Sequence, residues 1–287
     1  MGDAHELETR AKPTIDMRHL TTLAFFLTAG LAACGGDSGI TTPPPPQASV
    51  LLKEISVANL PAPFYHFDYD GAGVVTSASF AAGFRVYTMV YDGGRLSEMR
   101  NDAVGNLDRI QYFYDDAGRV SSVNYVDGTG VVFAHVSLTY DGSRLTRLER
   151  ERLFNGAFIV DKTMTLTYYP DGNLLEVAEH FPAIEGLQTE SATTDLFERY
   201  DNGINVDDFG LIHDEFFDNW ILLPGVRLQK GNPAKTTHLG DGDNFTVDYT
   251  YTYDDRNRPL VKSGDLLFTT GPDAGQHFQT QSAFSYY

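Results

Sequence analysis

Tyr91-Asp92-Gly93-Gly94-Arg95-Leu96 is the stretch from which the fold can be worked out, because it returns at regular intervals along the chain. Close copies are Tyr114-Asp115-Asp116-Ala117-Gly118-Arg119-Val120 and Tyr140-Asp141-Gly142-Ser143-Arg144-Leu145. Looser copies begin at Tyr69, Tyr169 and Tyr253. The first five tyrosines fall 22, 23, 26 and 29 residues apart, so one repeat has the length of a hairpin.

Each copy of this refrain predicts a turn between two strands. Asp at the start of a turn can accept a hydrogen bond from the backbone two residues on. Gly supplies the positive φ that hairpin loops of three to five residues need. Large side chains alternate with small ones in the flanks, as in Val136–Tyr140 and Val247–Tyr253. The predicted turn residues are Tyr91, Asp92, Gly94, Tyr114, Asp115, Gly118, Tyr140, Asp141, Gly142, Tyr253 and Asp254.

Composition narrows the class of protein. The regular hairpins favour one all-β domain over residues 50–287, roughly 230 residues long, and 16 Tyr and 19 Phe provide a substantial core. The formal charge of −18 argues against nucleic acid as a partner, because an acidic surface repels phosphate. The single cysteine excludes an intramolecular disulfide and a metal site built from several cysteines.

The N-terminal region predicts export and lipid attachment. Residues 1–16 are polar and resemble no targeting segment, so we expect translation to begin at Met17. Residues 17–33 have the pattern of a signal peptide, with an apolar run from Leu20 to Gly30 that is too short to span a bilayer stably. Leu31-Ala32-Ala33-Cys34 matches the bacterial lipobox.

The lipobox resemblance implies cleavage between Ala33 and Cys34 and acylation of Cys34 on its sulfur and its amino group. Several acyl chains anchor a protein stably where one would not. An ordinary secreted protein with a chance cysteine is the alternative. Residues 34–49 then form a tether, since Pro43 to Pro46 favour an extended polyproline II segment. Gly35 follows the cysteine where lipoproteins retained in the inner membrane often carry Asp, so we expect the outer membrane.

Residues 145–153 test whether the sheet could face lipid. Charges fall on both alternating faces of this predicted strand, Leu145-Thr146-Arg147-Leu148-Glu149-Arg150-Glu151-Arg152-Leu153. A charge at the middle of a bilayer costs a barrel about 2–4 kcal/mol. The sequence therefore predicts a sheet that stands in water, attached to the membrane through its lipid alone.

Residues 201–245 interrupt the refrain. Phe209, Ile212, Phe216 and Trp220 lie at helical spacing, so the pattern predicts a short helix over residues 207–222, ended by Pro224 and Gly225. An irregular loop held by aromatic side chains is the alternative.

The refrain resembles the tyrosine–aspartate (YD, or Rhs-type) repeats of bacterial surface and toxin-shell proteins, in which each repeat is a β-hairpin. The C-terminal third resembles a family of bacterial lipoproteins of unknown function with a porin-like β fold. Val206 and Asn257 depart from that family's pattern, which has Pro and Gly there. The resemblance implies a fold and a location and supplies no catalytic residues. The segments that carry it are Tyr200-Asp201-Asn202, Ile204-Asn205, Asn232-Pro233-Ala234-Lys235, Tyr249–Tyr253, Asp254-Asp255 and Pro259-Leu260-Val261-Lys262.

Strand count predicts the shape. Seven hairpins and a terminal strand give about 14 or 15 antiparallel strands, and a twisted open sheet of this size tends to curl or split. Closure removes the exposed edges. We therefore expect a closed or nearly closed, flattened barrel filled by aromatic side chains and the 207–222 segment, with a rolled open sheet as the alternative.

No catalytic motif stands out, and no cofactor is expected. Asp241-Gly242-Asp243-Asn244 resembles part of a calcium loop but lacks the distal Glu, so a turn is the better interpretation. The histidines show no metal-binding spacing. Trp220 and Phe216 are candidate contacts for a glycan, with core packing as the alternative. An acidic patch near His213 could do acid–base work, with a solvated face as the alternative; it comprises Asp207, Asp208, Asp214, Glu215 and Asp218.

The leading hypothesis is thus a non-enzymatic, lipid-anchored envelope protein whose β domain binds a partner or has a structural role. The partner would be a glycan or another envelope protein. The alternatives are a carrier that holds an apolar ligand or glycan inside the barrel, and a hydrolase that uses the acidic patch.

Overall fold

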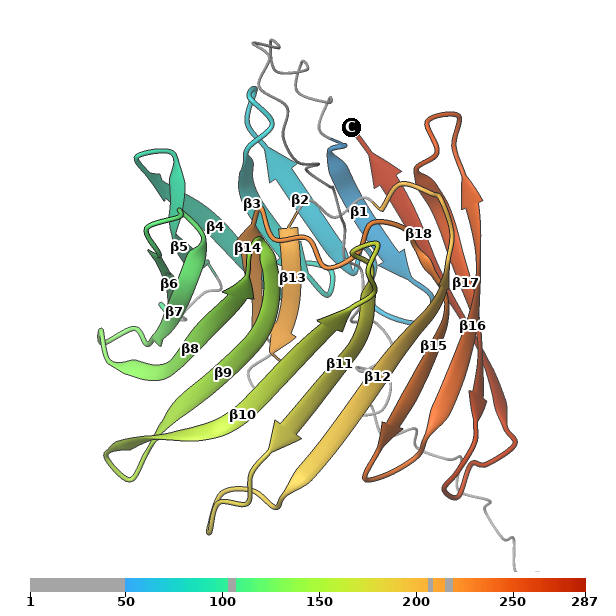
Figure 1. Cartoon of the computed structure of the whole chain (residues 1–287). Helices are drawn as coiled ribbons and strands as arrows, with labels where there is room; N and C mark the ends of the chain where they lie inside the picture. Colours follow the sequence, from blue (N-terminus) through green and yellow to red (C-terminus); the bar gives the residue numbers. More distant parts are fainter. Residues whose placement is uncertain (1–49, 103–106, 206–208, 215–218) are drawn as a thin grey trace, which may run out of the picture.

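The chain folds into a closed antiparallel β-barrel of 16 strands with a two-stranded hairpin inside it (Figure 1). The structure is a computed structural model that describes residues 50–102, 107–205, 209–214 and 219–287. The described part contains no helix, and so none that is long and apolar enough to cross a membrane. The all-β, hairpin-built fold class is confirmed, and the barrel is closed.

The barrel strands follow the chain in meander order, with each strand hydrogen-bonded to the next. The first eight are β1 (Leu52–Val57), β2 (Tyr65–Tyr69), β3 (Val75–Phe80), β4 (Arg85–Asp92), β5 (Arg95–Asn101), β6 (Arg109–Tyr114), β7 (Val120–Val126) and β8 (Val132–Asp141). The other eight are β9 (Arg144–Phe154), β10 (Ala157–Tyr168), β11 (Leu174–Phe181), β12 (Ser191–Tyr200), β15 (Pro233–Gly240), β16 (Phe245–Tyr253), β17 (Pro259–Phe268) and β18 (His277–Tyr286).

Closure joins the two ends of the barrel sheet. Strand β1 pairs with β2 on one side and with β18 on the other, so Ile55 lies opposite both Tyr65 and Phe284. The strand number of 14 or 15 expected from sequence is too low. The count is low because the turns at the other end of the barrel, such as residues 58–64 and 182–190, do not contain the refrain and so are harder to recognise in the sequence.

The refrain turns gather on one end of the barrel, here called the refrain rim (residues 70–74, 93–94, 115–119, 142–143, 169–173 and 254–258). The described chain also begins and ends there, where the backbone N–H of Tyr287 donates to the carbonyl of Leu51. The opposite end is called the far rim. A tether that precedes Val50 therefore reaches the barrel at its refrain rim.

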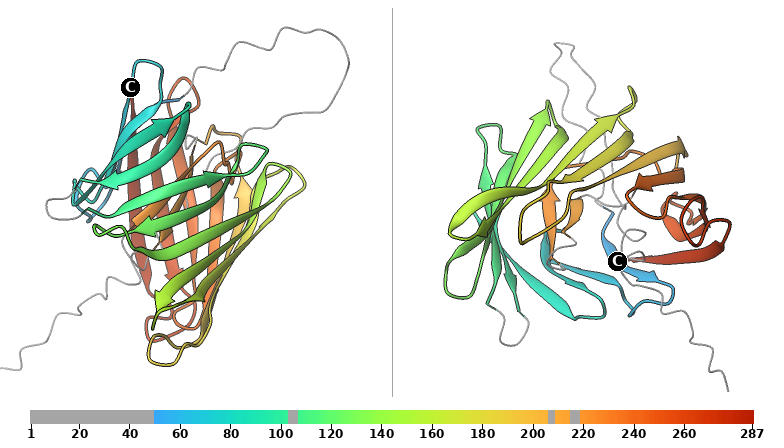
Figure 2. Two further views of the ribbon diagram at one scale, coloured as in Figure 1. Left: turned by 90° about the vertical axis from the view of Figure 1, so that its left-hand side faces the viewer. Right: turned by 90° about the horizontal axis from the view of Figure 1, so that it is seen from below.

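The predicted helix over residues 207–222 is wrong. The described residues of this segment form strands β13 (Phe209–Asp214) and β14 (Asn219–Pro224), paired antiparallel with Ile212 opposite Ile221. The hairpin lies within the ring of strands in both views (Figures 1 and 2). Ile221, Leu222 and Leu223 are at most 1% exposed and belong to the main core.

The core is unevenly distributed around the barrel. The main cluster joins the hairpin to the inner faces of β1 to β12, for example at Val123 and Leu145, which are fully buried. A smaller, separate cluster of Phe245, Val247 and Leu266 covers part of the inner face of β16 and β17. The inserted hairpin thus packs chiefly against one side of the barrel.

Candidate functional site

The predicted turn residues lie where the refrain rim turns the chain. Gly94, Gly118 and Gly142 have φ values of 80°, 79° and 59°, the left-handed region that favours glycine. A β-bulge or register shift falls just before Tyr91, Tyr114 and the refrain tyrosines Tyr69, Tyr140 and Tyr253. Bulges increase the local twist of a strand, which helps a sheet to close on itself.

A repeating hydrogen bond runs around the refrain rim. In each of the eight hairpins that open toward this rim, a tyrosine near the end of the second strand donates its hydroxyl to the backbone carbonyl at the start of the first strand. The eight bonds measure 2.5–2.9 Å and join Tyr69 to Leu52, Tyr91 to Val75, Tyr114 to Leu96, Tyr140 to Val120, Tyr168 to Leu145, Tyr200 to Leu174, Tyr251 to Pro233 and Tyr286 to Pro259.

Two of these tyrosines differ from the positions that the refrain predicts. Tyr168 makes the bond in place of Tyr169, whose hydroxyl donates to the carbonyl of Phe197 instead. Tyr251 makes it in place of Tyr253, whose hydroxyl contacts Asp201 and Asn232 from the insertion after β12. The insertion therefore changes the rim locally.

The arginine of the refrain links one repeat to the next. Arg95 lies over the ring of Tyr114, Arg119 over Tyr140, Arg144 over Tyr168 and Arg258 over Tyr286, with guanidinium-to-centroid distances of 4.2–5.8 Å. Asp115 accepts from the backbone N–H and the Nε of Arg119, at 2.9 and 2.8 Å. The backbone bond and then the guanidinium lower the pKa of Asp115. The refrain residues thus stabilise the rim mainly through contacts with one another.

The outer face of the barrel is charged around its circumference. Outward side chains from well-separated strands pair with one another. Arg109 lies 3.5 Å from Glu98, Arg147 2.6 Å from Glu149 and Lys235 3.2 Å from Glu198. His66 and His277 each lie 3.1 Å from a carboxylate, that of Glu54 and that of Asp265.

The interior also holds charges, and most of them are paired. The guanidinium of Arg150, in a fully buried side chain, donates to both carboxylate oxygens of Asp161 at 2.8 and 3.0 Å. Lys162 lies 2.9 Å from Glu179. His238 contacts Asp195 at 2.8 Å and stacks on Phe245, while burial raises the pKa of Asp195.

The inner face of β16 and β17 forms a second kind of surface, here called the tyrosine–lysine wall (Tyr249, Tyr251, Tyr253 and Lys262). The Lys262 ammonium lies 3.9 Å from the centroid of the Tyr249 ring. Neighbouring rings along β16 are 6.4 and 6.0 Å apart. Sequence reasoning identified this stretch as a strand and missed it as a site. The only signal was a tyrosine at every second position, which places three rings on one face.

The structure does not bring the predicted glycan contacts into a described site. The backbone of Trp220 in β14 pairs with His213 of β13, and Phe216 lies outside the described residues. Of the predicted acidic patch, Asp207, Asp208, Glu215 and Asp218 lie outside the described residues, and Asp214 ends β13. Ala33 and Cys34 also lie outside them.

The calcium-like stretch Asp241 to Asn244 is the turn between β15 and β16. Asp241 accepts from the backbone N–H of Ala192 at 3.1 Å, and Asn244 accepts from that of Gly240 at 2.8 Å. The side chains of the described ranges do not gather into any group of three or more His, Cys, Asp or Glu residues that could hold a metal ion.

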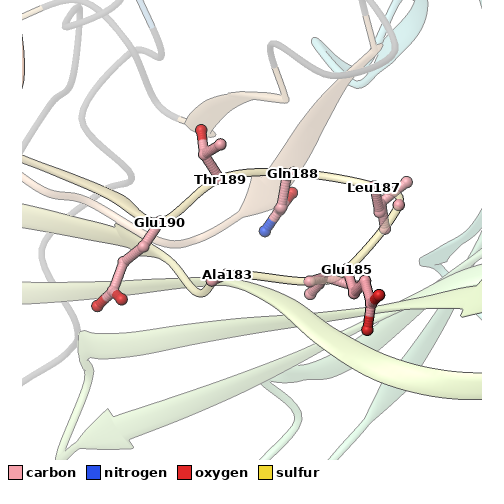
Figure 3. A pocket seen from close by; sticks show the side chains of 8 residues that line it. Ala183, Glu185, Leu187, Gln188, Thr189 and Glu190 are labelled. Atoms are coloured by element: carbon pink, nitrogen blue, oxygen red, sulfur yellow. The ribbon is translucent and has the colours of Figure 1, made fainter.

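An open hollow of about 750 Å³ lies in the loop of residues 183–190 on the far rim (Figure 3). The Gln188 amide donates to the carbonyls of Asp161 and Pro182 at 2.8 and 2.9 Å, which fixes the loop against β10. Glu185 and Glu190 are both exposed and point apart, so the hollow lacks converging polar groups. Its geometry is that of a folded loop.

The closed 16-strand barrel is similar in fold to solved structures described as porin-like. A porin-like protein from Bacteroides uniformis is similar to this chain with a TM-score of 0.53 at 15% identity, over 78% of this chain and 89% of the other. A porin-like protein from Bacteroides vulgatus is similar with a TM-score of 0.53 at 13% identity, over 83% and 99%. No protein-family model matches the sequence, and no curated protein matches it. At this identity, the likeness concerns the fold.

Proposed function

We propose that this protein is a non-enzymatic lipoprotein of the bacterial outer membrane whose barrel stands in water as a binding or structural module. The charged outer face carries the proposal. Glu98, Glu149 and Asp265 all point outward from the middle of their strands. Since each charge at the middle of a bilayer costs about 2–4 kcal/mol, a ring of such residues opposes insertion of the wall.

The position of the chain ends supports the lipid anchor. Residue 50, directly after the predicted tether, lies at the refrain rim, so a lipid on Cys34 would hold this rim toward the membrane and the far rim away from it. The similarity to two bacterial proteins described as porin-like supports an envelope location.

Metabolic labelling with an alkyne-bearing fatty acid tests the anchor. The full chain should incorporate the label and sediment with outer-membrane vesicles, whereas Cys34→Ser should do neither. Cys34 is the only cysteine, so no other thiol can carry a thioether-linked lipid. Equal labelling of the wild type and the variant would rule the anchor out. If any Cys34→Ser protein stays in the membrane pellet after washing with carbonate at high pH, the barrel wall itself crosses the bilayer, and the proposal that it stands in water is wrong.

A second function, that of a carrier with a ligand inside the barrel, is favoured by one observation. The residues of the tyrosine–lysine wall face inward but are only half-buried, so each keeps surface that a ligand could cover.

A further inference from the structure

Lys262 differs from most other cationic side chains inside the barrel. Four of them contact a carboxylate within 3.3 Å: Arg150 and Arg152 contact Asp161, Lys162 contacts Glu179, and His238 contacts Asp195. Arg85, opposite Phe80 on the inner face of β4, has no such contact among the described residues. Lys262 has no ion pair or hydrogen bond with any part of the chain that the structure describes, and its ammonium lies over the ring of Tyr249. In a chain of net charge −18, an interior cation without a carboxylate is unusual.

Several contacts show that this lysine faces inward. It pairs across the sheet with Tyr251, whose hydroxyl donates to the carbonyl of Pro233. Two residues further on, Gly264 allows the Tyr249 ring to cross the strand, because a Cβ there would lie 2.9 Å from that ring and 2.8 Å from Val247. Val247 is a core residue, so this face of β17 is the inner one.

The wall is accessible from the interior. Tyr249, Tyr251 and Lys262 are half-buried, and so are Thr280 and Ser282 on the neighbouring strand β18. Inward residues on the opposite side of the barrel, such as Val123 and Leu145, are fully buried by the inserted hairpin and its neighbours. The difference arises because the hairpin packs against the other side.

These groups together match one chemistry. The face of a tyrosine ring suits the flat, C–H-bearing face of a sugar ring, and serine and threonine hydroxyls hydrogen-bond sugar hydroxyls. Desolvation lowers the pKa of Lys262 to about 8, and an anion beside the ammonium would offset that penalty. A neutral sugar would leave the Lys262 ammonium without a counter-charge, and a small inorganic anion would make no stacking contact with the tyrosine rings.

We propose that Tyr249, Tyr251 and Lys262 form a binding site inside the barrel for an acidic sugar, with the carboxylate on Lys262 and the sugar ring on a tyrosine face. The hydroxyls of Thr280 and Ser282 lie on the adjacent strand, within the same inner surface. This inference rests on the binding role proposed above and is independent of the lipid anchor.

Isothermal titration calorimetry on the full chain tests the site with trigalacturonate, with neutral maltotriose and with acetate as probes. We expect heat of binding for trigalacturonate and little for the other two. Lys262→Met keeps an unbranched side chain over Tyr249 and removes an unpaired charge, so it should fold. It should weaken binding by about tenfold or more, which corresponds to about 1.4 kcal/mol. Lys53→Met is the matched control, because Lys53 lies over the ring of Tyr287 at the rim, 5.5 Å from its centroid, and its loss should leave the affinity for trigalacturonate unchanged.

Chemical labelling gives a second readout. Because a lysine with a lowered pKa is more often uncharged near neutral pH, acetic anhydride should modify Lys262 faster than Lys53, and trigalacturonate should slow only the reaction of Lys262. Equal affinity of the wild type and Lys262→Met would overturn the proposal. So would the absence of binding to trigalacturonate, glucuronate or sialyllactose at millimolar concentrations. The fatty-acid labelling proposed above tests only the anchor, so a failure to label would not affect the conclusion about the sugar site.

Discussion

The hydroxyl bonds of the refrain rim give the sharpest test of how this barrel is held together. Changing Tyr91, Tyr140 and Tyr200 to Phe removes three hydroxyl-to-carbonyl bonds of 2.7–2.8 Å and keeps the rings. One such bond contributes about 0.5–1.5 kcal/mol, and well-separated sites add, so the triple variant should lose about 1.5–4.5 kcal/mol. For a domain of this size, that loss lowers the melting temperature by roughly 3–18 °C. Urea unfolding measures the loss of free energy and thermal unfolding the shift of the melting temperature, both followed by circular dichroism.

Tyr287→Phe is the matched control. Its hydroxyl also reaches a backbone carbonyl, that of Phe67 at 3.1 Å, but the side chain is 57% exposed and water can replace the bond. We expect a change within about 0.5 kcal/mol, as for most surface substitutions. The reasoning would be refuted if the triple Phe variant were as stable as the wild type while a triple Leu variant unfolded, because ring packing alone would then hold the rim.

Three further predictions concern charge. Burial raises the pKa of Tyr91 to about 12, whereas an unfolded tyrosine ionises near 10, so stability should be complete below about pH 10 and fall as the pH rises toward 12, measured by urea midpoints across that range. The pKa of Asp115 is lowered by its bonds to Arg119, so its contribution to the free energy of unfolding should be present above about pH 4 and be lost as the pH falls further. Asp115→Asn should reduce this loss of stability in acid, measured by urea midpoints, and an unchanged dependence on pH would contradict the assignment. Asp161→Asn should destabilise the protein by about 3–5 kcal/mol, because Arg150 is left buried beside a neutral amide, and a midpoint equal to that of the wild type would show that the pair contributes nothing.

The parts of the fold that follow from neighbouring residues could be predicted from sequence. Asp115 and Gly118 are enough to define a turn, and the alternation in Val136–Tyr140 is enough to define a strand with one inner face. Repetition then sets the meander order, because successive hairpins can pair only with their neighbours. Closure was expected because open edges are unfavourable, and the pairing of β1 with β18 supplies it.

The inserted hairpin could not be predicted because a strand that is buried on both faces does not show the alternation of apolar and polar residues that identifies a strand in sequence. A strand with one face in water alternates, but Ile221, Leu222 and Leu223 are all buried although they are consecutive. Such a continuous apolar run is consistent with either a buried strand or a buried helix. The spacing of Phe209 and Ile212 then favoured a helix by coincidence.

The tyrosine–lysine wall was missed for a related reason. Along the chain, Lys262 is one charged residue on a strand next to a polar turn, and nothing near it in sequence shows whether it faces water. Its environment depends on which side of the barrel the inserted hairpin packs against. The hairpin packs against the opposite wall, where the side chain of Tyr112 bonds to the backbone of Leu222. The hairpin joins the main core on one side of the barrel, whereas Lys262 on the other side is only half-buried and lies outside both core clusters. The residues that pack the core are thus separate from those of the proposed binding site.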